Sequence, residues 1–550
     1  MTRLHWLQDT NKLPTLGQHW VDTCKRPGNP EVLVDTTGTS LESLKALTAS
    51  ILLGRLFRKT CSRQNIGLLL PSTAGSALAN MACMLLGRTA VNLNFTASNE
   101  ALLASVELAE IRTIFTSNRF LEKLRTRGVD VDTLAARYKL VPLEQLAKQN
   151  SSLRKVLTFA TCKLLPAALL RKIWCQPCEV TRTAVILFSS GSEGVPKGVM
   201  LSHRAILANV KQIAQLLNFR SDDVVLANLP PFHAFGLTVT HFMPLLERVK
   251  VVCHPDPTEV VGAAQAIAQH RVTMMFGTSS FFRLYNRNSR VEPQMLESVR
   301  LAIAGAEKLQ EEVRDEFLRK FDKDILEGYG ATETAPVASV NIPDFLMSED
   351  WPASTGNKPG SVGIPLPDTA FRIVDPDTFE ALPTGDAGMI LISGPQLMDG
   401  YFKNTEKTTE VLRRFDDKYW YVSGDKGYLD GEGFLYIQDR YSRFAKIGGE
   451  MVGLGAVEKA LREFVSKPEF ETVVVSLPDA KKGERLVALV TMGVDAHAIR
   501  NGLSASGLNS LAFPSRYLLV GEIPKLGSGK TDFATAKKLA LKMSCEEQEN

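Results

Sequence analysis

Short apolar runs that alternate with amphipathic helical patterns dominate the chain from Asn65 to Arg271. The run "NIGLLL" precedes the helical stretch "SALANMACMLLGR", and "TAVNLN" precedes "SNEALLASVELAE". The same rhythm returns in "AVILFSS", "VVLANLP", "VKVVCHP", "VTMMFGTSS" and "RLAIAGAE". A buried strand followed by a helix is the repeating unit of a largely parallel sheet, so we predict an α/β fold. Such sheets bind ligands at the carboxyl ends of their strands, where these runs become polar or glycine-rich.

The length of the chain and the changes in composition along it predict more than one domain, because 550 residues are more than a single hydrophobic core usually organises. After about Gly360, short alternating strands rich in Gly, Pro and Asp predict a small β subdomain. After about Arg440, charged and Gly-rich residues lead to a helix near "GAVEKALREF" and to the strands "TVVVSL" and "RLVALVTM". We expect an N-terminal domain, residues 1–440, of α/β subdomains plus the β subdomain, and a small mobile α+β C-terminal domain, residues 441–550.

The composition argues against several classes of protein. The formal net charge is only +4, which provides no overall field for nucleic acid. We find no export signal in the first residues, and no apolar run approaches the roughly 20 residues that span a bilayer. Eight scattered cysteines fit a reduced setting, and Cys175 and Cys178 lack the further ligands of a zinc site. These features predict a cytoplasmic globular protein.

The segment from Leu153 to Trp174 departs from the α/β pattern, because it mixes apolar residues with five basic ones. Pro166 interrupts it, and Lys163 argues against a membrane span. Two interpretations remain open: peripheral contact with the inner face of a membrane, or a surface connection packed on the domain.

The stretch "SSGSEGVPKG" after the run "AVILF" combines hydroxyls, glycines and a lysine, as a phosphate-binding loop does. It matches neither a Walker loop, because Gly198 follows the lysine, nor the GxGxxG dinucleotide motif. We interpret it as a triphosphate loop. The residues assigned to this loop are Ser189, Ser190, Gly191, Ser192, Glu193, Gly194 and Lys197.

Six further segments follow this loop in a recognisable order: "PPFHAFG", "AGAEKL", "EGYGATE", "YVSGDKG", "DRYSRFAKIGGE" and "PKLGSGK". Together with the loop they resemble the acyl-adenylate-forming (AMP-binding) superfamily, from Leu187 to Lys530. The resemblance implies that a carboxylate attacks the α-phosphate of ATP, giving acyl-AMP and pyrophosphate, and that a thiol then takes the acyl group. ATP and Mg²⁺ are therefore the expected cofactors.

The resemblance also assigns roles to the nucleotide-site residues. Glu333, with Thr332 beside it, would handle Mg²⁺ and the α-phosphate, because Mg²⁺ prefers hard oxygen ligands. Asp425 would accept bonds from both ribose hydroxyls, as a carboxylate with two oxygens can. Arg440 would be a second nucleotide contact. The residues expected around adenine are Tyr329, Gly330, Gly305 and Ala306.

Lys530 matches the lysine that reaches the α-phosphate and the carboxylate during adenylation, so the C-terminal domain would have to close on the ATP site. The expected hinge lies near Arg440 to Ser442. Lys446, Gly448 and Gly449 would then border the passage of the thiol arm. The residues expected to line the acyl site are His233, Phe235, Gly236, Gly277, Thr278 and Ser279.

Within the superfamily, Glu193 in place of the more usual Thr and strings such as "LPPFHAFGLTV" are similar to the synthetase half of bacterial acyl-acyl-carrier-protein synthetase/2-acylglycerophosphoethanolamine acyltransferases. The acyltransferase motif His-x4-Asp is missing. We expect a ligase that loads a long-chain fatty acid onto acyl carrier protein. The alternatives are coenzyme A as acceptor, or a nucleotide-binding or membrane-docking protein without catalysis.

Overall fold

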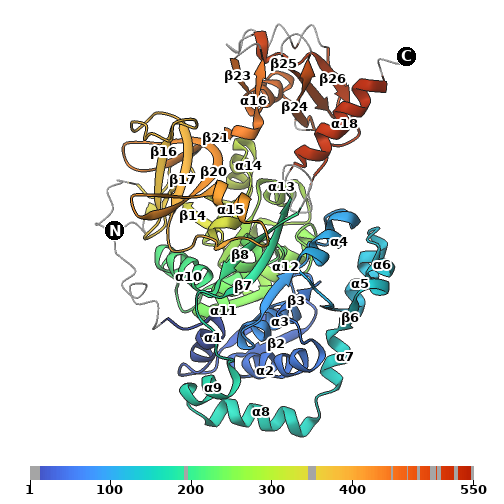
Figure 1. The fold of residues 1–550 in the computed structure, drawn as a ribbon, viewed down its shortest axis with the longest axis vertical. Helices are drawn as coiled ribbons and strands as arrows, with labels where there is room; N and C mark the ends of the chain where they lie inside the picture. The colour runs from blue at the N-terminus through green and yellow to red at the C-terminus, as the bar shows by residue number, and fades with distance from the viewer. Residues whose placement is uncertain are drawn as a thin grey trace.

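The computed structural model describes residues 13–190, 196–344, 355–447, 450–467, 469–479, 483–495, 499, 503, 510–525 and 531–546. Within these residues the strands form two large sheets with helices packed on them, a smaller antiparallel sheet, and a C-terminal sheet (Figure 1). The fold is mixed α/β, as the sequence predicts. Among the described helices, none is long and apolar enough to cross a bilayer.

The first large sheet is parallel except at one end, where β8 and β18 run antiparallel to their neighbours. Its central strands are buried along their whole length, which is why they read as continuous apolar runs in the sequence. Across the sheet its strands are β18 (Gly400–Tyr401), β8 (Pro196–Ser202), β7 (Thr183–Ser190), β4 (Thr89–Asn92), β3 (Asn65–Leu68), β5 (Thr113–Thr116) and β6 (Lys139–Pro142).

The second large sheet is parallel at its centre and antiparallel at both ends. Across the sheet its strands are β15 (Ile364–Pro365), β14 (Val337–Val340), β13 (Ile325–Gly330), β12 (Leu301–Ala304), β11 (Met274–Gly277), β9 (Val224–Ala227), β10 (Lys250–Cys253), β1 (Glu31–Asp35) and β2 (Thr39–Glu42). The strand-helix units from Asn65 to Arg271 are thus divided between two sheets rather than laid on one. A single apolar core continues from one sheet to the other, which explains why the sequence pattern does not change between them.

The helices that cover these sheets begin at side-chain caps. The hydroxyls of Thr73, Ser202 and Thr278 each accept a hydrogen bond from the backbone N–H three residues on. The helices of this region are α1 (Leu16–Cys24), α2 (Ser43–Thr60), α3 (Ala74–Leu85), α4 (Asn99–Leu108), α5 (Asn118–Thr126), α6 (Val131–Arg137), α7 (Leu143–Lys148), α8 (Ser152–Leu164), α9 (Ala167–Trp174), α10 (His203–Leu217), α11 (Met243–Glu247), α12 (Val260–His270), α13 (Ser279–Arg287) and α14 (Glu311–Phe321), with the π-helix η3 (Phe235–Phe242) and the 3₁₀ turns η4 (Pro293–Leu296) and η5 (Thr332–Thr334).

The smaller sheet is antiparallel and corresponds to the β subdomain expected after Gly360. It contains β16 (Ala370–Val374), β17 (Gly388–Ser393), β20 (Lys418–Leu429), β19 (Leu412–Phe415) and β21 (Leu435–Arg440), with α15 (Thr405–Val411) beside it. Two strands of this region pair elsewhere. β15 completes the second large sheet, and β18 returns to β8 of the first.

The C-terminal sheet begins after the turn η7 (Tyr441–Arg443) and has two apolar clusters of its own. Its elements are β22 (Phe444–Ile447), β23 (Glu450–Gly453), α16 (Leu454–Val465), β24 (Thr472–Asp479), β25 (Gly483–Val490), η8 (Ser510–Ala512), β26 (Arg516–Leu519) and α18 (Phe533–Glu546). The carboxylate of Asp439, at the end of β21, accepts a bond from the N–H of Gly455 in α16 at 2.9 Å. A Cβ on Gly455 would lie 2.4 Å from that carboxylate, so a side chain there would displace the carboxylate from this bond.

Candidate functional site

The residues expected around the nucleotide and the acid follow the carboxyl ends of adjacent parallel strands. β9, β11, β12 and β13 are neighbours in the second large sheet. His233 lies in the loop after β9, Thr278 follows β11, Ala306 follows β12 and Thr332 follows β13. Open α/β sheets bind ligands at this edge, because the loops that leave the strands converge there.

A buried carboxylate, Asp425 of β20, is held by groups from two other strands. The hydroxyl of Tyr329 in β13 donates to Asp425 Oδ2 at 2.5 Å, and Nε of Arg440 in β21 donates to Oδ1 at 3.0 Å. The side chain of Arg440 is 65% exposed, whereas Asp425 is 4% exposed. Burial, and then the charge of Asp425, hold the pKa of Tyr329 well above its usual value, so the phenol stays a donor.

The carboxylate of Asp425 keeps acceptor capacity beyond these two bonds. An ionised carboxylate offers about four lone-pair sites, and the tyrosine and the arginine occupy two of them. Two hydroxyls on adjacent carbons of a sugar could therefore bind the same group.

A second carboxylate, that of Glu333 in η5, is 9% exposed and accepts a bond at Oε1 from the hydroxyl of Tyr401 in β18 at 2.8 Å. Burial, and then the charge of Glu333, raise the pKa of Tyr401, so this phenol also remains protonated. Glu333 Oε2 has no hydrogen-bond partner among the residues that the structure describes. One hard oxygen with substrate phosphates and water for the remaining positions fits Mg²⁺, and no group of three metal-binding side chains occurs in the described chain.

The phenol of Tyr421 in β20 is close enough to both carboxylates for their charges to raise its pKa. It is 6% exposed, and after burial the charge of Glu333 is the next cause of its raised pKa, followed by Tyr401 and Asp425. The ammonium of Lys197 in β8 lies 6.0 Å from the centre of the Tyr401 ring. Ser189 stands opposite Lys197 in the β7–β8 pair, so the described part of the phosphate loop starts beside Tyr401 and Glu333.

Two glycines of this region are required by close backbone approach, and a third lies against an aromatic ring. A Cβ on Gly330 would lie 1.8 Å from the carbonyl oxygen of Pro336, and one on Gly236 would lie 2.2 Å from that of Pro230. A Cβ on Gly305 would lie 3.3 Å from the ring of Phe235. Any side chain at the first two positions would shift the backbone that carries the site.

The residues expected to bind the acid come from the loop before η3 and from the start of α13. Phe235 begins η3 and lies edge-on to Phe276. The Gly305 N–H donates to the Gly277 carbonyl at 3.0 Å, which joins the ends of β12 and β11. Thr278 caps α13, and Ser279 Oγ accepts from the Gln310 N–H at 3.1 Å. The hydroxyl oxygens of Thr278 and Ser279 therefore accept structural bonds, and a hydroxyl that accepts can still donate its own hydrogen.

The π-helix η3 holds the backbone of this loop. The Gly236 carbonyl accepts from Thr240 Oγ1 at 2.6 Å and from His241 Nδ1 at 3.0 Å. Burial lowers the pKa of His241 to about 4, so the ring is neutral near pH 7. π-Helical turns often occur at functional sites, and here the turn positions the segment that contains His233 and Phe235.

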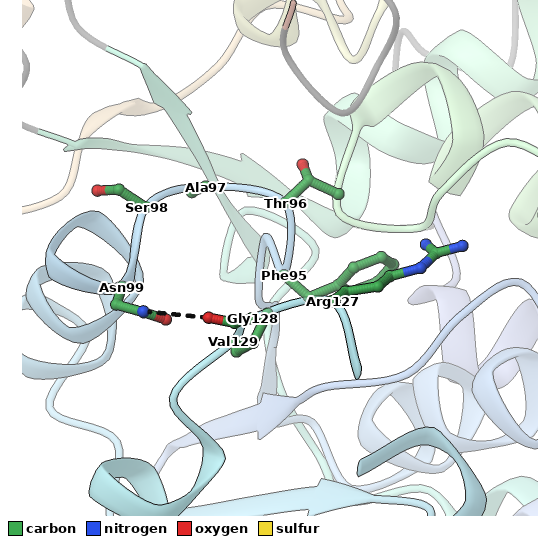
Figure 2. Close-up of a pocket in the computed structure, with 8 residues that line it drawn as sticks. All are labelled: Phe95, Thr96, Ala97, Ser98, Asn99, Arg127, Gly128 and Val129. Atoms are coloured by element: carbon green, nitrogen blue, oxygen red, sulfur yellow. Dashed lines mark hydrogen bonds between the residues drawn. The ribbon is translucent and has the colours of Figure 1, made fainter. Parts of the chain in front are cut away.

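A cavity of about 300 Å³ lies between the loop after β4 and the turn that joins α5 to α6 (Figure 2). Its lining includes Phe95, whose ring meets that of Phe232 edge-on at 4.7 Å, and Phe232 in turn lies 4.6 Å from the ring of His233. Among the described residues that are expected to bind nucleotide, none lines it.

Several expected site residues lie outside the described residues: Gly191, Ser192, Glu193, Gly194, Gly448, Gly449 and Lys530. Ser190 and Lys446 are described only as positions in β7 and β22. Conversely, Tyr401 and Tyr421 contact or lie near the two buried carboxylates of the candidate site, and the sequence assigns no role to either. Tyr401 lies in a two-residue strand without a periodic pattern, and only its pairing with β8 places it beside Glu333.

The chain is similar to known proteins over much of its length. The family model "AMP-binding enzyme" matches residues 43–402. The long-chain-fatty-acid–CoA ligase of Bacillus subtilis (strain 168) is 32% identical over 354 residues, 63% of this chain and 60% of that protein. The probable 4-coumarate–CoA ligase 2 of Dictyostelium discoideum is 33% identical over 307 residues, 55% of this chain and 52% of that protein. The chain thus aligns with less than two thirds of the length of these relatives.

The solved structures add support for the fold. O-succinylbenzoate coenzyme A synthetase (MenE) from Bacillus subtilis, in complex with ATP and magnesium ion, superposes with a TM-score of 0.75 at 23% identity. The alignment covers 94% of this chain and 99% of that one. The family match spans more than half of the chain and includes Glu333, Tyr329 and Tyr401. The chain therefore belongs to the AMP-binding enzyme family.

Proposed function

We propose that this protein is an AMP-forming ligase that activates a long-chain fatty acid with ATP and Mg²⁺. The observation that carries the proposal is the buried Asp425, held by Tyr329 and Arg440 at the strand ends, with a second buried carboxylate, Glu333, nearby. In a member of the AMP-binding family, this arrangement would supply a ribose acceptor from β20 and a metal ligand from the turn η5.

The chemistry follows from the charges. An oxygen of the fatty carboxylate forms a bond to the α-phosphorus of ATP, and the bond from that phosphorus to the bridging oxygen of pyrophosphate breaks. Mg²⁺, held by Glu333 and the phosphates, would offset the crowded negative charge. The protein provides no nucleophile. Asp425 and Arg440 orient the nucleotide, and Lys197 adds positive charge near the phosphate loop.

In the second step a thiol attacks the acyl carbonyl and AMP leaves. We propose that Lys530 serves the first step and that the C-terminal domain, residues 441–550, turns about Arg440 to Ser442 between the steps. The names of the relatives favour coenzyme A as the acceptor. The resemblance around Glu193 and "LPPFHAFGLTV" favours acyl carrier protein, which is the second candidate.

Pyrophosphate exchange tests the first step. The purified chain with ATP, Mg²⁺ and a long-chain fatty acid should exchange labelled pyrophosphate into ATP, and absence of exchange with fatty acids of every chain length would refute the proposal. Thioester yield with coenzyme A and with holo-acyl carrier protein then identifies the acceptor. Lys530→Ala should abolish exchange while it spares transfer from preformed acyl-AMP, and equal loss of both steps would contradict its role.

A further inference from the structure

Helices α8 and α9 present an apolar face to solvent. Three leucines of α8, Leu153, Leu157 and Leu164, are 68%, 58% and 78% exposed. Val156 of α8 and Leu169 and Ile173 of α9 are exposed as well. These two helices thus hold six of the thirteen large apolar side chains that are exposed among the described residues. A soluble protein normally scatters such residues, so their concentration marks an interaction surface.

The polarity of α8 is inverted relative to an ordinary surface helix. At 3.6 residues per turn, Leu153, Val156, Leu157 and Leu164 fall on one side. The buried residues of the helix, Thr158 and Cys162, lie on the opposite side, where α8 packs on α2. The small polar residues therefore face the protein and the leucines face water.

The charges around this face have one sign. The segment from Ser151 to Cys175 contains five basic residues and no acidic one. Only Arg171 makes an ion pair within the described chain, to Asp22 at 3.0 Å. Arg154 and Lys163 flank the apolar side of α8 on its two sides, and both are exposed. A leucine stripe bordered by lysines and arginines complements a surface that is apolar beneath and anionic above.

The neighbouring helix α2 extends the positive charge. Arg55 and Arg58 line a small cavity of about 50 Å³ together with Ile173 and Trp174 of α9. The Arg55 guanidinium lies 5.7 Å from the Trp174 ring centre, and the indole N–H of Trp174 is buried without a hydrogen-bond partner in the described chain. The side chains of Arg55, Arg58 and Trp174 at this edge are hydrogen-bond donors, beside Gln176, whose amide both donates and accepts, and the phosphate of a lipid headgroup accepts such bonds.

We propose that α8 and α9 dock the protein on an anionic lipid bilayer, with the leucines in the interfacial layer and the basic side chains on lipid phosphates. In Figure 1 these helices form the lower end of the molecule, and the C-terminal sheet lies at the upper end. Docking through this end leaves the C-terminal sheet in water. The proposal does not depend on the enzymatic function, because it rests on the composition and exposure of this surface alone.

Vesicle binding by the full chain tests the proposal. The protein should bind vesicles of phosphatidylcholine with phosphatidylglycerol much more tightly than vesicles of phosphatidylcholine alone, and the preference should shrink as salt is raised. Each basic residue near an anionic surface contributes about fivefold, so Arg154→Gln with Lys163→Gln should weaken binding by about 25-fold. Leu157→Ser with Leu164→Ser should weaken binding to both kinds of vesicle.

The matched control uses exposed residues of α18: Lys537→Gln with Lys538→Gln for the charges, and Leu541→Ser for the apolar side chain. These variants should bind vesicles like the wild type, and all variants should keep the thermal unfolding midpoint, because every substituted side chain is exposed. Equal binding by the α8 variants and the controls would overturn the proposal. A second outcome would overturn the proposal too: the wild-type protein binds acyl carrier protein but not vesicles, and the Arg154/Lys163 variant no longer binds acyl carrier protein. An acidic protein would then be the partner.

Discussion

The bonds of Asp425 allow a quantitative prediction for Asp425→Asn. The wild-type carboxylate gives Oδ2 to Tyr329 and Oδ1 to Arg440, and it keeps about two acceptor positions for a ribose diol. Asparagine keeps one acceptor oxygen and replaces the other with a donor. One charge-assisted bond to the ribose is therefore lost, which is worth about 1.5–3 kcal/mol. We expect the KM for ATP in pyrophosphate exchange to rise about 10- to 150-fold.

Two further variants separate ribose binding from folding. Asp425→Ala removes both acceptors and should weaken ATP binding more than Asp425→Asn, as measured by calorimetric titration. Asp430, in the turn between β20 and β21, pairs with Lys358 at 2.8 Å and lies at the opposite end of the same hairpin. Asp430→Asn should lower the unfolding midpoint slightly and leave the KM for ATP unchanged. A KM within twofold of wild type for Asp425→Asn, or an equal rise for Asp430→Asn, would refute the assignment.

Three other residues give predictions of different kinds. Tyr401→Phe removes the hydrogen-bond donor to Glu333, so it should slow pyrophosphate exchange about tenfold and weaken the dependence of the rate on Mg²⁺. Tyr419→Phe, at an exposed residue, is the control and should leave the rate unchanged. Equal rates for the two variants would exclude Tyr401 from the site. Gly330→Ala should destabilise the fold by about 1–3 kcal/mol in urea titrations, because its Cβ would meet the Pro336 carbonyl at 1.8 Å, and an unchanged midpoint would contradict that geometry. Burial lowers the pKa of His203 to about 4, so between pH 6.5 and 4 the unfolded chain binds a proton that the folded chain does not. The free energy of unfolding should therefore fall by about 3 kcal/mol as pH drops through this window, and His203→Asn should reduce that slope; an identical slope would show that this ring is not responsible.

The sequence predicts the strands from Asn65 onward well, because strands buried on both faces must be apolar throughout. It does not predict the division into two sheets. β1, in "EVLVD", joins β10 through pairs such as Leu33 with Val251, a contact of high sequence separation that no local pattern marks. Partner choice depends on tertiary packing, so the sequence does not predict the pairing of β1 with β10 or of β15 with β14.

In the candidate site, too, short motifs predict individual residues, whereas contacts between residues distant in the sequence appear only in the structure. Asp425 and Tyr329 are found through motifs, since each lies in a short string of characteristic residues. Their mutual hydrogen bond joins residues 96 positions apart and is visible only in the structure. Tyr401 has no motif in our reading, and its role emerges because β18 crosses back to β8.

Consecutive residues at the end of β21 connect two parts of the protein. Asp439 accepts from Gly455 of α16, and Arg440, one peptide bond later, donates to the carboxylate expected to bind ribose. Neighbouring residues of a strand point to opposite faces, so Asp439 contacts the C-terminal sheet's helix α16 while Arg440 contacts Asp425. A displacement of α16 would be transmitted through a single peptide unit to Arg440, and an occupied ribose site would in turn resist that displacement. We therefore expect the position of the C-terminal sheet and the affinity for nucleotide to be linked through the same two residues.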